Sequence, residues 1–478
     1  MARSIISIDD LTIDEMEAIF QLADRFLDEM GDPAKPYRLM GRNDLASKFI
    51  LATLFFEAST RTRLSFESAM LRLGGSTISS ADGAQTSASK GETIADTVRV
   101  VSSYADALVI RHPLEGAARV AADYAGLPVI NAGDGSHEHP TQTLCDLYTL
   151  RAAQAEKGRL RSIHSIKDLN VVIWGDLLNG RTVHSLVYAL ARLKARIIPR
   201  AAPGFELPEH VASRLARDYH CMPITKDNVH DGLPPDIDVV YLTPDEPHQL
   251  ALFDMKQQTQ VKGLSTVDAL YSTRLQLERL ATSYAGQYPA VNSEFLKQKR
   301  YRDANVMHPL PRVDELSYDI DEDKRSMYFK QAAYGVPVRM ALIASLLELD
   351  PALATQPSAN ESRYPVYSQP TGIECSNEKC VSRSSAERRY LIPRFWILQQ
   401  SPPMLRCAFC DVEQAPHAVG SVSTHKFTTD LADWQDTDAA ERIFFTDESQ
   451  AAAAGYSPRK ATKPKKAVSS DSIPLPAQ

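Results

Sequence analysis

Apolar runs that end in short polar turns alternate with helical periodicities along most of the chain. The apolar residues of segment 49–56 predict a buried strand, and apolar residues then recur at helical spacing from Leu64 to Leu73. The same succession of strand, turn and helix starts again near residues 107, 128 and 169. Because this alternation is typical of α/β proteins, we expect two doubly wound parallel-sheet domains joined by interdomain helices.

The periodicity also places the other elements and the domain boundaries. Strands are expected at residues 107–110, 128–131, 169–174, 195–198, 239–242, 269–271 and 306–307. Helices are expected over residues 8–30 (opening at Ser7 or Asp9), from Glu92, over 141–150, and over 327–349 with an interruption near Gly335 and Pro337. We therefore expect a first domain over residues 1–150, closed by the helix at 327–349, and a second domain over residues 151–326.

The turn within FFEASTRTRLSF combines the properties of an anion site. It joins a buried strand to the start of a helix, where free backbone N–H groups and the positive end of the helix dipole gather. Ser59, Thr60 and Thr62 add hydroxyl donors, and Arg61 and Arg63 add permanently charged guanidinium groups. Two arginines at this position oppose the dipole, which favours a multiply charged anion such as phosphate. The alternative is an ordinary capped helix with solvated arginines.

Polar residues also follow other predicted strands of the first domain. Arg111, His139 and Gln142 each come after the carboxyl end of a strand, where ligands collect in open α/β sheets. A lone histidine is usually structural, but polar clusters at successive strand ends favour a functional His139. Ser87 and Lys90 lie in a loop of small residues, in which the lysine would be a movable charge. A plain surface loop is the alternative there.

The second domain offers a further cationic set. Arg181 and Thr182 open a helix after the strand at 169–174, and Arg274 follows the strand at 269–271. The chain has no GxGxxG motif, so a dinucleotide-binding fold is not indicated. Two cationic sets that face each other across an interdomain cleft predict two anionic substrates, one of them a phosphate compound.

The overall composition makes these local cations more informative. The 478-residue chain has a formal net charge of -7, so it is a poor general binder of nucleic acid or anionic membranes. No apolar run reaches the length of a membrane span, and the N-terminus lacks the apolar core of a secretory signal. Six cysteines do not make a disulfide scaffold in a chain of this length. We therefore expect a cytoplasmic protein.

Successive segments of the chain resemble the motifs of the aspartate carbamoyltransferase family. These segments are FFEASTRTRLSFESAMLRLGG, ASKGETIADT, VIRHPLEGAAR, NAGDGSHEHPTQTLCDL, GDLLNGRTVHSL, TRLQLERL and MHPLPRVDEL, and the resemblance covers about residues 1–350. It implies transfer of a carbamoyl group from carbamoyl phosphate to L-aspartate, the first committed step of pyrimidine synthesis, with no catalytic metal. It also implies a catalytic homotrimer, or a multiple of trimers, with active sites shared between subunits.

The resemblance assigns roles to the predicted site residues. Those implied to bind carbamoyl phosphate are Ser59, Thr60, Arg61, Thr62, Arg111, His139 and Gln142. Those implied to bind L-aspartate are Ser87, Lys90, Arg181, Thr182, Arg274, Gln276, Pro309 and Leu310. Those implied to act on the reacting groups are Arg61, Thr62, Lys90, Arg111, His139 and Gln142. The pair Ser87 and Lys90 would enter the site of the neighbouring subunit.

Ornithine carbamoyltransferases share the phosphate turn and are the nearest competing family. That family has HCLP where this chain has HPLP, and Arg274 and the SxxKGE loop favour a carboxylate substrate. One departure concerns residues 244–272, which separate VVYLT from TRLQ, whereas the two motifs are continuous in close relatives. A catalytically inactive homologue that acts as a scaffold is a further alternative, but every expected active-site side chain is present.

The C-terminal region carries four cysteines with the spacing of a structural metal site. Cys375 and Cys380 form C-x4-C, and Cys407 and Cys410 form C-x2-C. Four thiolates at such spacing favour a closed tetrahedral zinc site that leaves no position open for catalysis. We expect a small β zinc-ribbon-like domain over residues 371–415, which needs its metal to fold.

The segments IECSNEKC and LRCAFC resemble the zinc domain of the regulatory chain of bacterial aspartate carbamoyltransferase. The nucleotide-binding domain of that chain has no counterpart, because only a linker rich in Pro, Ser and Gln, residues 351–370, precedes the cysteines. We therefore expect no effector site for CTP or ATP. A zinc ribbon that binds nucleic acid is the alternative, but basic residues near the metal are few. Residues 416–478 are expected to form a small helical unit and a disordered tail.

Overall fold

The computed structural model describes residues 2–80, 91–159, 161–201, 204–223, 237–243, 266–274, 290–350, 364–400, 402–430 and 438–459. The chain divides into two compact units. The first comprises residues 1–363, 377–391 and 408–412, and the second comprises residues 364–376, 392–407 and 413–478. Among the described residues, no helix combines the length and the apolar character that a membrane span requires.

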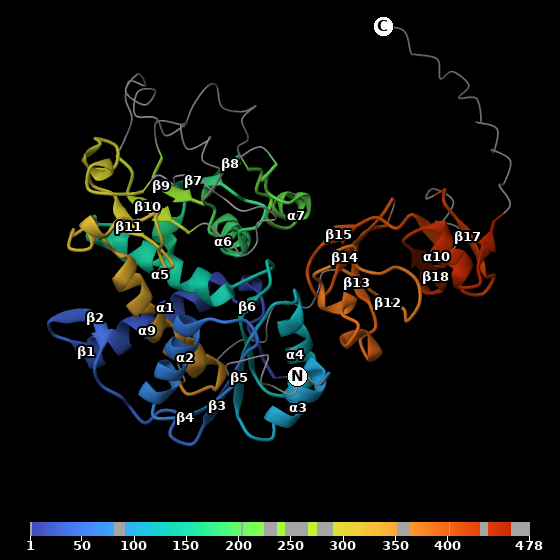
Figure 1. Cartoon of the computed structure of the whole chain (residues 1–478), viewed down its shortest axis with the longest axis horizontal. Helices are drawn as coiled ribbons and strands as arrows, with labels where there is room; N and C mark the ends of the chain where they lie inside the picture. The colour runs from blue at the N-terminus through green and yellow to red at the C-terminus, as the bar shows by residue number, and fades with distance from the viewer. Residues whose placement is uncertain are drawn as a thin grey trace, which may run out of the picture. The chain divides into compact units, whose positions relative to one another are not determined.

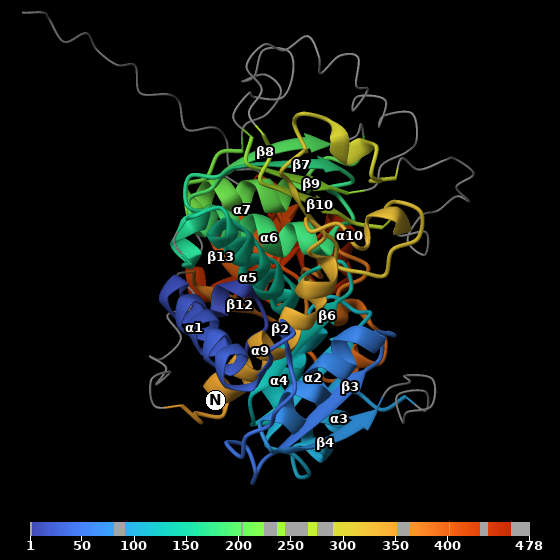
Figure 2. The same cartoon turned by 90° about the vertical axis from the view of Figure 1, so that its left-hand side faces the viewer.

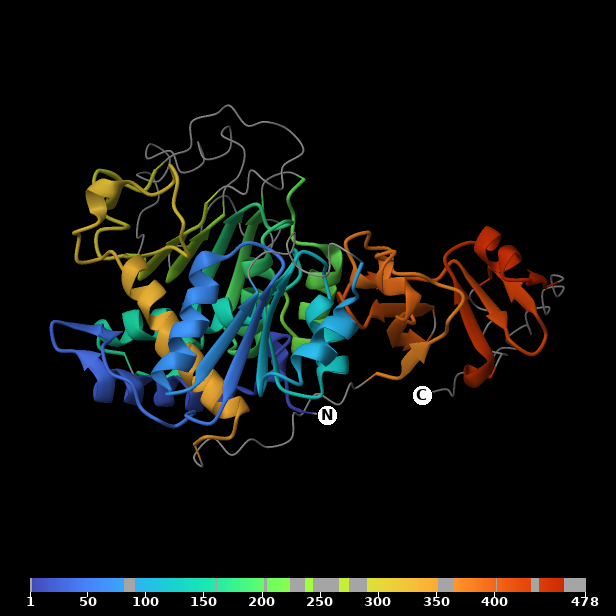
Figure 3. The same cartoon turned by 60° about the horizontal axis from the view of Figure 1, so that its bottom comes forward.

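A four-stranded parallel sheet forms the N-terminal half of the first unit. Its strand order is β4-β3-β5-β6, with β3 (Ile50–Phe55), β4 (Ser76–Ser80), β5 (Ala107–His112) and β6 (Val129–Asp134). The helices that connect these strands are α2 (Thr60–Arg72), α3 (Ile94–Val101) and α4 (Ala117–Ala125). The order reverses after β4, so α3 and α4 cover one face of the sheet and α2 the other (Figure 3). This is the doubly wound arrangement predicted from the sequence.

A five-stranded parallel sheet forms the other half of the first unit. Its strand order is β11-β10-β9-β7-β8, with β7 (Asn170–Gly175), β8 (Arg196–Ala201), β9 (Val239–Leu242), β10 (Ala269–Ser272) and β11 (Asn305–Met307). Helices α6 (Arg181–Arg192) and α7 (Glu209–Tyr219) lie side by side (Figure 2). Strand β10 lies within the segment 244–272, so the described part of that segment adds a strand beside β9.

Long helices pack between the two sheets. They are α1 (Ile13–Met30), α5 (Pro140–Glu156) and α9 (Tyr328–Leu346), and α9 packs against α1, α2 and α5 (Figure 1). The expected interruption near Gly335 and Pro337 is wrong, because α9 runs continuously through both residues. A proline removes one helical hydrogen bond, and the burial of this half of α9 compensates for that loss. The fold class is thus confirmed for the first unit.

The N-terminal helix is divided, contrary to the single helix expected over residues 8–30. A short 3-10 helix, η1 (Ile8–Asp10), precedes α1, and each has its own capping box. Ser7 caps the first of them and Thr12 caps the second. The two caps therefore start two elements where the apolar periodicity indicated only one. Other short elements of this unit are β1 (Gly31–Asp32), β2 (Lys35–Leu39), η4 (Ile163–Ile166), η8 (Phe295–Lys297), η9 (Tyr318–Ile320), η11 (Val381–Arg383) and η12 (Glu387–Arg389).

Two small sheets make up the second unit. The first has the order β12-β13-β14-β15, with β12 (Val366–Ser368), β13 (Arg394–Gln400), β14 (Pro403–Cys407) and β15 (Glu413–Gln414), all antiparallel. The second has the order β18-β16-β17-β19, with β16 (Ala418–Ser421), β17 (Lys426–Thr428), β18 (Arg442–Phe445) and β19 (Ser457–Pro458). In the second sheet β17 and β19 pair in parallel and the other pairs are antiparallel, and the two sheets confirm a small C-terminal β domain.

Two expectations for the C-terminal region need correction. The expected linker over residues 351–370 includes β12, which pairs with β13, while residues 351–363 lie outside the described part. In its described part, the expected helical unit is mostly a sheet with two short helices, the 3-10 helix η14 (Ala439–Glu441) and α10 (Glu448–Ala453). Three consecutive apolar residues, Ile443, Phe444 and Phe445, form a buried strand there, because β18 pairs with β16, Tyr367 packs on Phe444, and Tyr456 packs on Phe445. Residues 460–478 of the expected tail lie outside the description.

Candidate active site

The predicted anion turn lies at the N-terminus of α2. Ser59 is the N-cap, and its side chain makes no capping hydrogen bond within the described part of the chain. The guanidinium of Arg61 donates to the carbonyl of Leu310 across 2.6 Å. Arg63 instead lies 3.8 Å from Glu67 and reaches Ser79, so only Arg61 of the two arginines turns toward the loop at 309–310.

Arg61 and Arg274 approach each other from the two halves of the first unit. Arg61 follows β3 of the four-stranded sheet, and Arg274 follows β10 of the five-stranded sheet. Partial burial, and then the positive charge of Arg274, lower the pKa of Arg61. One arginine from each predicted cationic set therefore approaches the other, and their mutual repulsion would be relieved by an anion between them.

Arg111 lies in β5 rather than after it, at the carboxyl end of the strand. It is 6% exposed, pairs with Glu57 across 2.8 Å and donates to the carbonyl of Ala132 across 3.2 Å. The carboxylate of Glu57 and the carbonyl of Ala132 hold the guanidinium beside the α2 turn. Glu57 belongs to the FFEAST motif but was not among the residues predicted from the sequence.

His139 and Gln142 begin helix α5. His139 is the buried N-cap, and its backbone N–H donates to Ser185 Oγ of α6 across 2.9 Å. The side-chain amide of Gln142 donates to Asp146 Oδ1 one turn later, across 2.8 Å. Because Nε2 of Gln142 is committed to Asp146, its Oε1 is left as a hydrogen-bond acceptor.

Asp146 is a buried hub that the sequence analysis missed. Besides Gln142, its carboxylate accepts from Gln331 Nε2 across 2.8 Å and from Tyr271 Oη across 3.0 Å. Burial raises the pKa of Asp146 to about 7, although the three donors and Arg339 oppose that rise. The hub connects α5, α9 and β10, and its i,i+4 spacing from Gln142 is the one local signal that could have indicated it.

The loop after β11 is fixed through His308. The backbone N–H of Leu310 donates to His308 Nδ1 across 2.8 Å, and His308 Nε2 lies 2.8 Å from Glu315. The ring therefore carries its proton on Nε2 and accepts at Nδ1. Burial lowers the pKa of His308, which keeps that acceptor available. Leu310 has a φ of 52°, so the loop presents the Leu310 carbonyl toward Arg61 in a conformation that few side chains adopt.

The remaining predicted aspartate residues are placed only in part. Thr182 Oγ1 lies 3.0 Å from Tyr241 Oη, near the start of α6, and Arg181 is the first residue of that helix. The turn before α6 requires glycine, because Gly175 has a φ of 103° and a Cβ there would lie 2.0 Å from the Thr243 carbonyl. The predicted residues outside the described part are Ser87, Lys90 and Gln276.

Three family models match the chain. Residues 3–152 match the carbamoyl-P binding domain of aspartate/ornithine carbamoyltransferase, and residues 248–346 match its Asp/Orn binding domain. Residues 371–419 match the metal binding domain of the aspartate carbamoyltransferase regulatory chain. The three matches follow one another in the order that the sequence motifs indicated.

Individual relatives agree with these models. The aspartate carbamoyltransferase catalytic subunit of Thermoplasma acidophilum is 43% identical over 350 residues, which cover 72% of this chain and 98% of the relative. This chain belongs to the aspartate carbamoyltransferase family. The solved catalytic subunit of M. jannaschii aspartate transcarbamoylase has a TM-score of 0.54 at 38% identity, over 72% of this chain and 98% of its own.

A further solved member is the aspartate transcarbamoylase of Trypanosoma cruzi in complex with carbamoyl phosphate and aspartate. It has a TM-score of 0.53 at 31% identity and covers 72% of this chain and 95% of its own. The predicted activity is confirmed: the chain is an aspartate carbamoyltransferase, which transfers the carbamoyl group of carbamoyl phosphate to L-aspartate. The matched metal binding domain makes it a fusion of catalytic and regulatory-chain sequences.

The four C-terminal cysteines of this carbamoyltransferase form one buried cluster. The sulfurs of Cys375, Cys380, Cys407 and Cys410 lie within 4.8 Å of one another. Four thiolates bound at about 2.3 Å to one zinc ion lie roughly 3.8 Å apart, so the cluster has the size and the donors of such a site. A metal-binding cluster is therefore present, with all four positions supplied by the chain.

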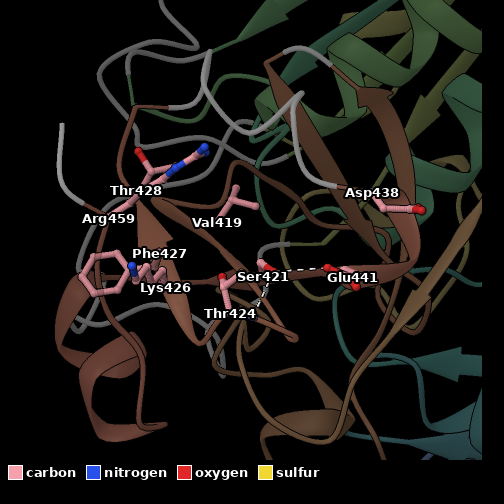
Figure 4. A pocket seen from close by; sticks show the side chains of 9 residues that line it. All are labelled: Val419, Ser421, Thr424, Lys426, Phe427, Thr428, Asp438, Glu441 and Arg459. Atoms are coloured by element: carbon pink, nitrogen blue, oxygen red, sulfur yellow. Dashed lines mark hydrogen bonds between the residues drawn. The ribbon is translucent and has the colours of Figure 1, made fainter. Parts of the chain in front are cut away.

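A separate pocket lies in the C-terminal sheet of this carbamoyltransferase, and Figure 4 shows it from close by. It has a volume of about 350 Å³. Glu441 accepts hydrogen bonds there from Ser421 and Ser423. The pocket contains none of the predicted carbamoyl phosphate or aspartate residues, and its lining residues are Val419, Ser421, Thr424, Lys426, Phe427, Thr428, Asp438, Glu441 and Arg459.

His112, at the end of β5, is expected to make the free energy of unfolding depend on pH in the acid range. Its Nδ1 accepts from the Leu114 N–H across 3.0 Å, and burial lowers its pKa to about 4, against the carboxylates of Asp134 and Glu57. Because the unfolded chain takes up this proton first, the folded state loses stability as pH falls from about 6.5 to 4, by about 3 kcal/mol in total. We expect the stability advantage of wild type over His112→Gln, measured by urea unfolding, to shrink by that amount over this pH range.

The comparison with His112→Gln is needed because other buried groups titrate in the opposite sense. Burial raises the pKa of Glu138 and of Asp146 to about 7, so these carboxyls favour the folded state as pH falls. Their contribution cancels when the two proteins are compared at each pH. A difference in unfolding free energy that stays constant from pH 6.5 to 4 would show that His112 is not held neutral.

Proposed function

We propose that the described residues around Arg61 form the catalytic centre of this aspartate carbamoyltransferase. The supporting observation is that one guanidinium, at the N-terminus of α2, meets the Leu310 carbonyl and the charge of Arg274 from the other half of the unit. Both substrates are anions, and this is where cations from both halves converge. The site thereby holds two like-charged reactants close together, and proximity alone lowers the barrier by roughly 7–11 kcal/mol.

The phosphate of carbamoyl phosphate would bind at the α2 turn. The backbone N–H groups after Ser59, the hydroxyls of Thr60 and Thr62 and the Arg61 guanidinium provide donors there. Arg61 is bound to Leu310 in the structure, so a phosphate would draw the guanidinium away from that carbonyl. The Leu310 carbonyl, and that of Pro309, would then be available to the amino group of aspartate.

The carbamoyl group would lie against Arg111, His139 and Gln142. We assign its oxygen to Thr62, Arg111 and His139, and its nitrogen to the Oε1 acceptor of Gln142, which the bond from Gln142 Nε2 to Asp146 orients. Fixed donors around the oxygen stabilise the charge that develops as the amine attacks, by roughly 3–4 kcal/mol for each donor. The new C–N bond forms as the bond to the phosphate oxygen breaks, and the amine proton passes to the leaving phosphate.

The two carboxylates of aspartate would bind the cations of the second half of the unit. We assign them to Arg274 and to the start of α6, where Arg181 and Thr182 lie, together with Gln276. Ser87 and Lys90 would add contacts from a neighbouring subunit. Support for this assignment comes from the descriptions of the matched family model and of the T. cruzi complex with aspartate.

Shared active sites give a test of the proposed homotrimer. Arg61→Ala and Lys90→Ala chains should each be nearly inactive alone, because each removes a substrate contact. When the two variants are mixed and reassembled, some sites receive an intact Arg61 from one chain and an intact Lys90 from its neighbour. We expect activity to recover to about a quarter or less of wild type, measured as carbamoyl-aspartate formation. Complete absence of recovery, with trimers present by mass, would argue against shared sites.

An assay of the wild-type protein with each amino acid separates aspartate from ornithine as the substrate. Formation of carbamoyl-aspartate from aspartate, and no citrulline from ornithine, is the expected result. We further propose that the metal of the four-cysteine cluster is zinc, which the regulatory-chain match supports. A cytoplasmic location and a place at the start of pyrimidine synthesis are proposed on the same family basis.

A further inference from the structure

Two loops from the C-terminal extension lie within the first unit. They are residues 377–391 and 408–412, and we call them the extension loops. Each begins or ends beside metal-cluster cysteines, but the contacts that matter here are with the four-stranded sheet. One set of contacts reaches the start of α3, and another reaches, directly or through Glu115, the segment 134–139, the loop that leads from β6 to His139 and α5.

The first extension loop forms hydrogen bonds with Glu115, and Glu115 in turn forms a hydrogen bond with the 134–139 loop. The backbone of Glu115 donates to the Lys379 carbonyl across 3.0 Å and accepts from Val381 across 2.8 Å. Its carboxylate accepts from Asn377 Nδ2 across 2.6 Å and, on the other oxygen, from the Ser136 N–H across 3.3 Å. Glu115 is 7% exposed, so these bonds are shielded from water. One carboxylate thus connects the extension to the active-site loop.

The second extension loop makes a more direct connection through Asp411. Its Oδ2 lies 3.1 Å from His137 Nε2 and 3.0 Å from Arg214 Nη1. His137 belongs to the 134–139 loop, whereas Arg214 belongs to α7 of the five-stranded half. The other ring nitrogen of His137 lies 3.0 Å from Asp134. Asp411 is therefore a single, partly buried anion that joins both halves of the catalytic unit.

Close packing supports the same contact. Gly116 has a φ of 86°, and a Cβ at this position would lie 2.6 Å from Phe409 Cβ, so the second extension loop lies directly on the backbone here. The N–H of Gly116 also donates to Asp134 Oδ2 across 2.8 Å. A larger residue at 116 would separate the extension loop from the sheet.

Helix α6 fixes the opposite side of the 134–139 loop. His184 Nδ1 lies 3.1 Å from the Ser136 carbonyl, and the His139 N–H donates to Ser185. The loop is thus held between α6 on one side and the extension loops on the other. Burial alone would lower the pKa of His137, but Asp134 and Asp411 raise it well above its ordinary value, which keeps the ring cationic between two carboxylates.

We propose that Asp411 is a positioning residue for carbamoyl transfer, which acts through His137 and Arg214 to set the 134–139 loop and hence His139. The role of His139 on the carbamoyl oxygen rests on the proposed function above. The extension is then an internal part of the catalytic unit as well as a metal-binding module. Removal of the Asp411 charge leaves His137 with Asp134 and Arg214 with Asp9, but takes away the anion between the two cations, so we expect the loop and α7 to separate.

The test compares Asp411→Asn with Glu378→Gln in the full chain. Glu378 is an exposed residue of the first extension loop, so Glu378→Gln removes the same charge from the extension loops without breaking the contact with His137. For Asp411→Asn we expect kcat to fall about 10- to 100-fold, as displacement of a catalytic group by a fraction of an ångström predicts, with less than a threefold change in KM for carbamoyl phosphate. We expect Glu378→Gln to behave as wild type. Amide hydrogen exchange in peptides spanning 134–139 should accelerate only in Asp411→Asn.

The His139 background separates positioning from general damage. In His139→Ala, adding Asp411→Asn should lower kcat less than threefold further, because the group being positioned is gone. An equal loss in both backgrounds, or unchanged exchange at 134–139 with metal content intact, overturns the proposal. If Asp411→Asn fails to fold, His137→Gln breaks the same connection while the Asp411–Arg214 pair remains, and it should show the same loss. A wild-type chain that makes no carbamoyl-aspartate would refute the proposed function, while the exchange measurement still decides the role of Asp411.

Discussion

Replacement of Arg61 by alanine is expected to lower kcat/KM for carbamoyl transfer by about a thousandfold or more. Arg61 combines a phosphate-binding charge with an approach to Arg274 and to the Leu310 carbonyl. Loss of one fixed donor to developing charge typically costs a factor of about a hundred to a thousand, and Arg61 also supplies binding. Steady-state kinetics with both substrates varied, together with a circular dichroism spectrum to confirm folding, measures this.

Arg63 provides a matched control for that experiment. It lies two residues later on the same helix, but its guanidinium is engaged with Glu67 and Ser79. Arg63→Ala should therefore keep kcat/KM within about fivefold of wild type, since a partly exposed i,i+4 pair contributes little to stability. Equal losses for the two variants would contradict the assignment of Arg61, because charge near the helix N-terminus alone would then explain both.

Loss of a cluster cysteine is expected to remove the bound metal and to unfold the sheet β12–β15. A structural zinc site of four thiolates contributes an apparent folding free energy of about 10–16 kcal/mol in small domains. A sheet this short cannot stay folded after the loss of so large a contribution. We expect about one zinc per wild-type chain by elemental analysis and much less than one in Cys407→Ser. Limited proteolysis should then cut residues 392–414 of the variant quickly.

Cys221 offers the comparison for the metal experiment. It is half-buried near the end of α7, and its backbone N–H donates to Leu215. Cys221→Ser should retain the metal and the proteolytic resistance of the C-terminal sheet. Full metal content in Cys407→Ser would contradict a four-cysteine site, and loss of metal in Cys221→Ser would point to a general effect of folding.

The residues that local sequence could place were those at strand ends and helix starts. Arg61 and His139 follow buried strands, Arg111 lies at the carboxyl end of one, and the doubly wound topology brings such positions to one edge of a sheet. The residues that position these side chains could not be predicted in the same way. Asp146 and Asp411 look like ordinary surface carboxylates in the sequence, because their partners lie far away along the chain. Only tertiary structure could reveal them.

The C-terminal region was harder to predict for a different reason. Its strands have two to seven residues, too short for periodicity to separate strand from helix. The apolar residues near Phe444 were assigned to a helix, and they instead pair in β18 with β16. Apolar periodicity also failed to predict the ends of two helices. The cap at Thr12 sets the start of α1, and packing keeps α9 continuous across Pro337.

The position of β16 in the second unit bears on how this chain can be dissected. The regulatory-chain match stops at residue 419, in the middle of β16, whose backbone pairs with β17 and β18. Strand β18 also receives the N–H of Ile373 across 2.7 Å and donates to Tyr367. A shortened chain that ends at residue 419 would keep only half of β16 and would lack its partners β17 and β18. It would also remove the hydrogen bonds that Ile373 and Tyr367 make with β18. The described residues after position 419, which are 420–430 and 438–459, are thus hydrogen-bonded to the module before them, and a clean excision must take both or neither.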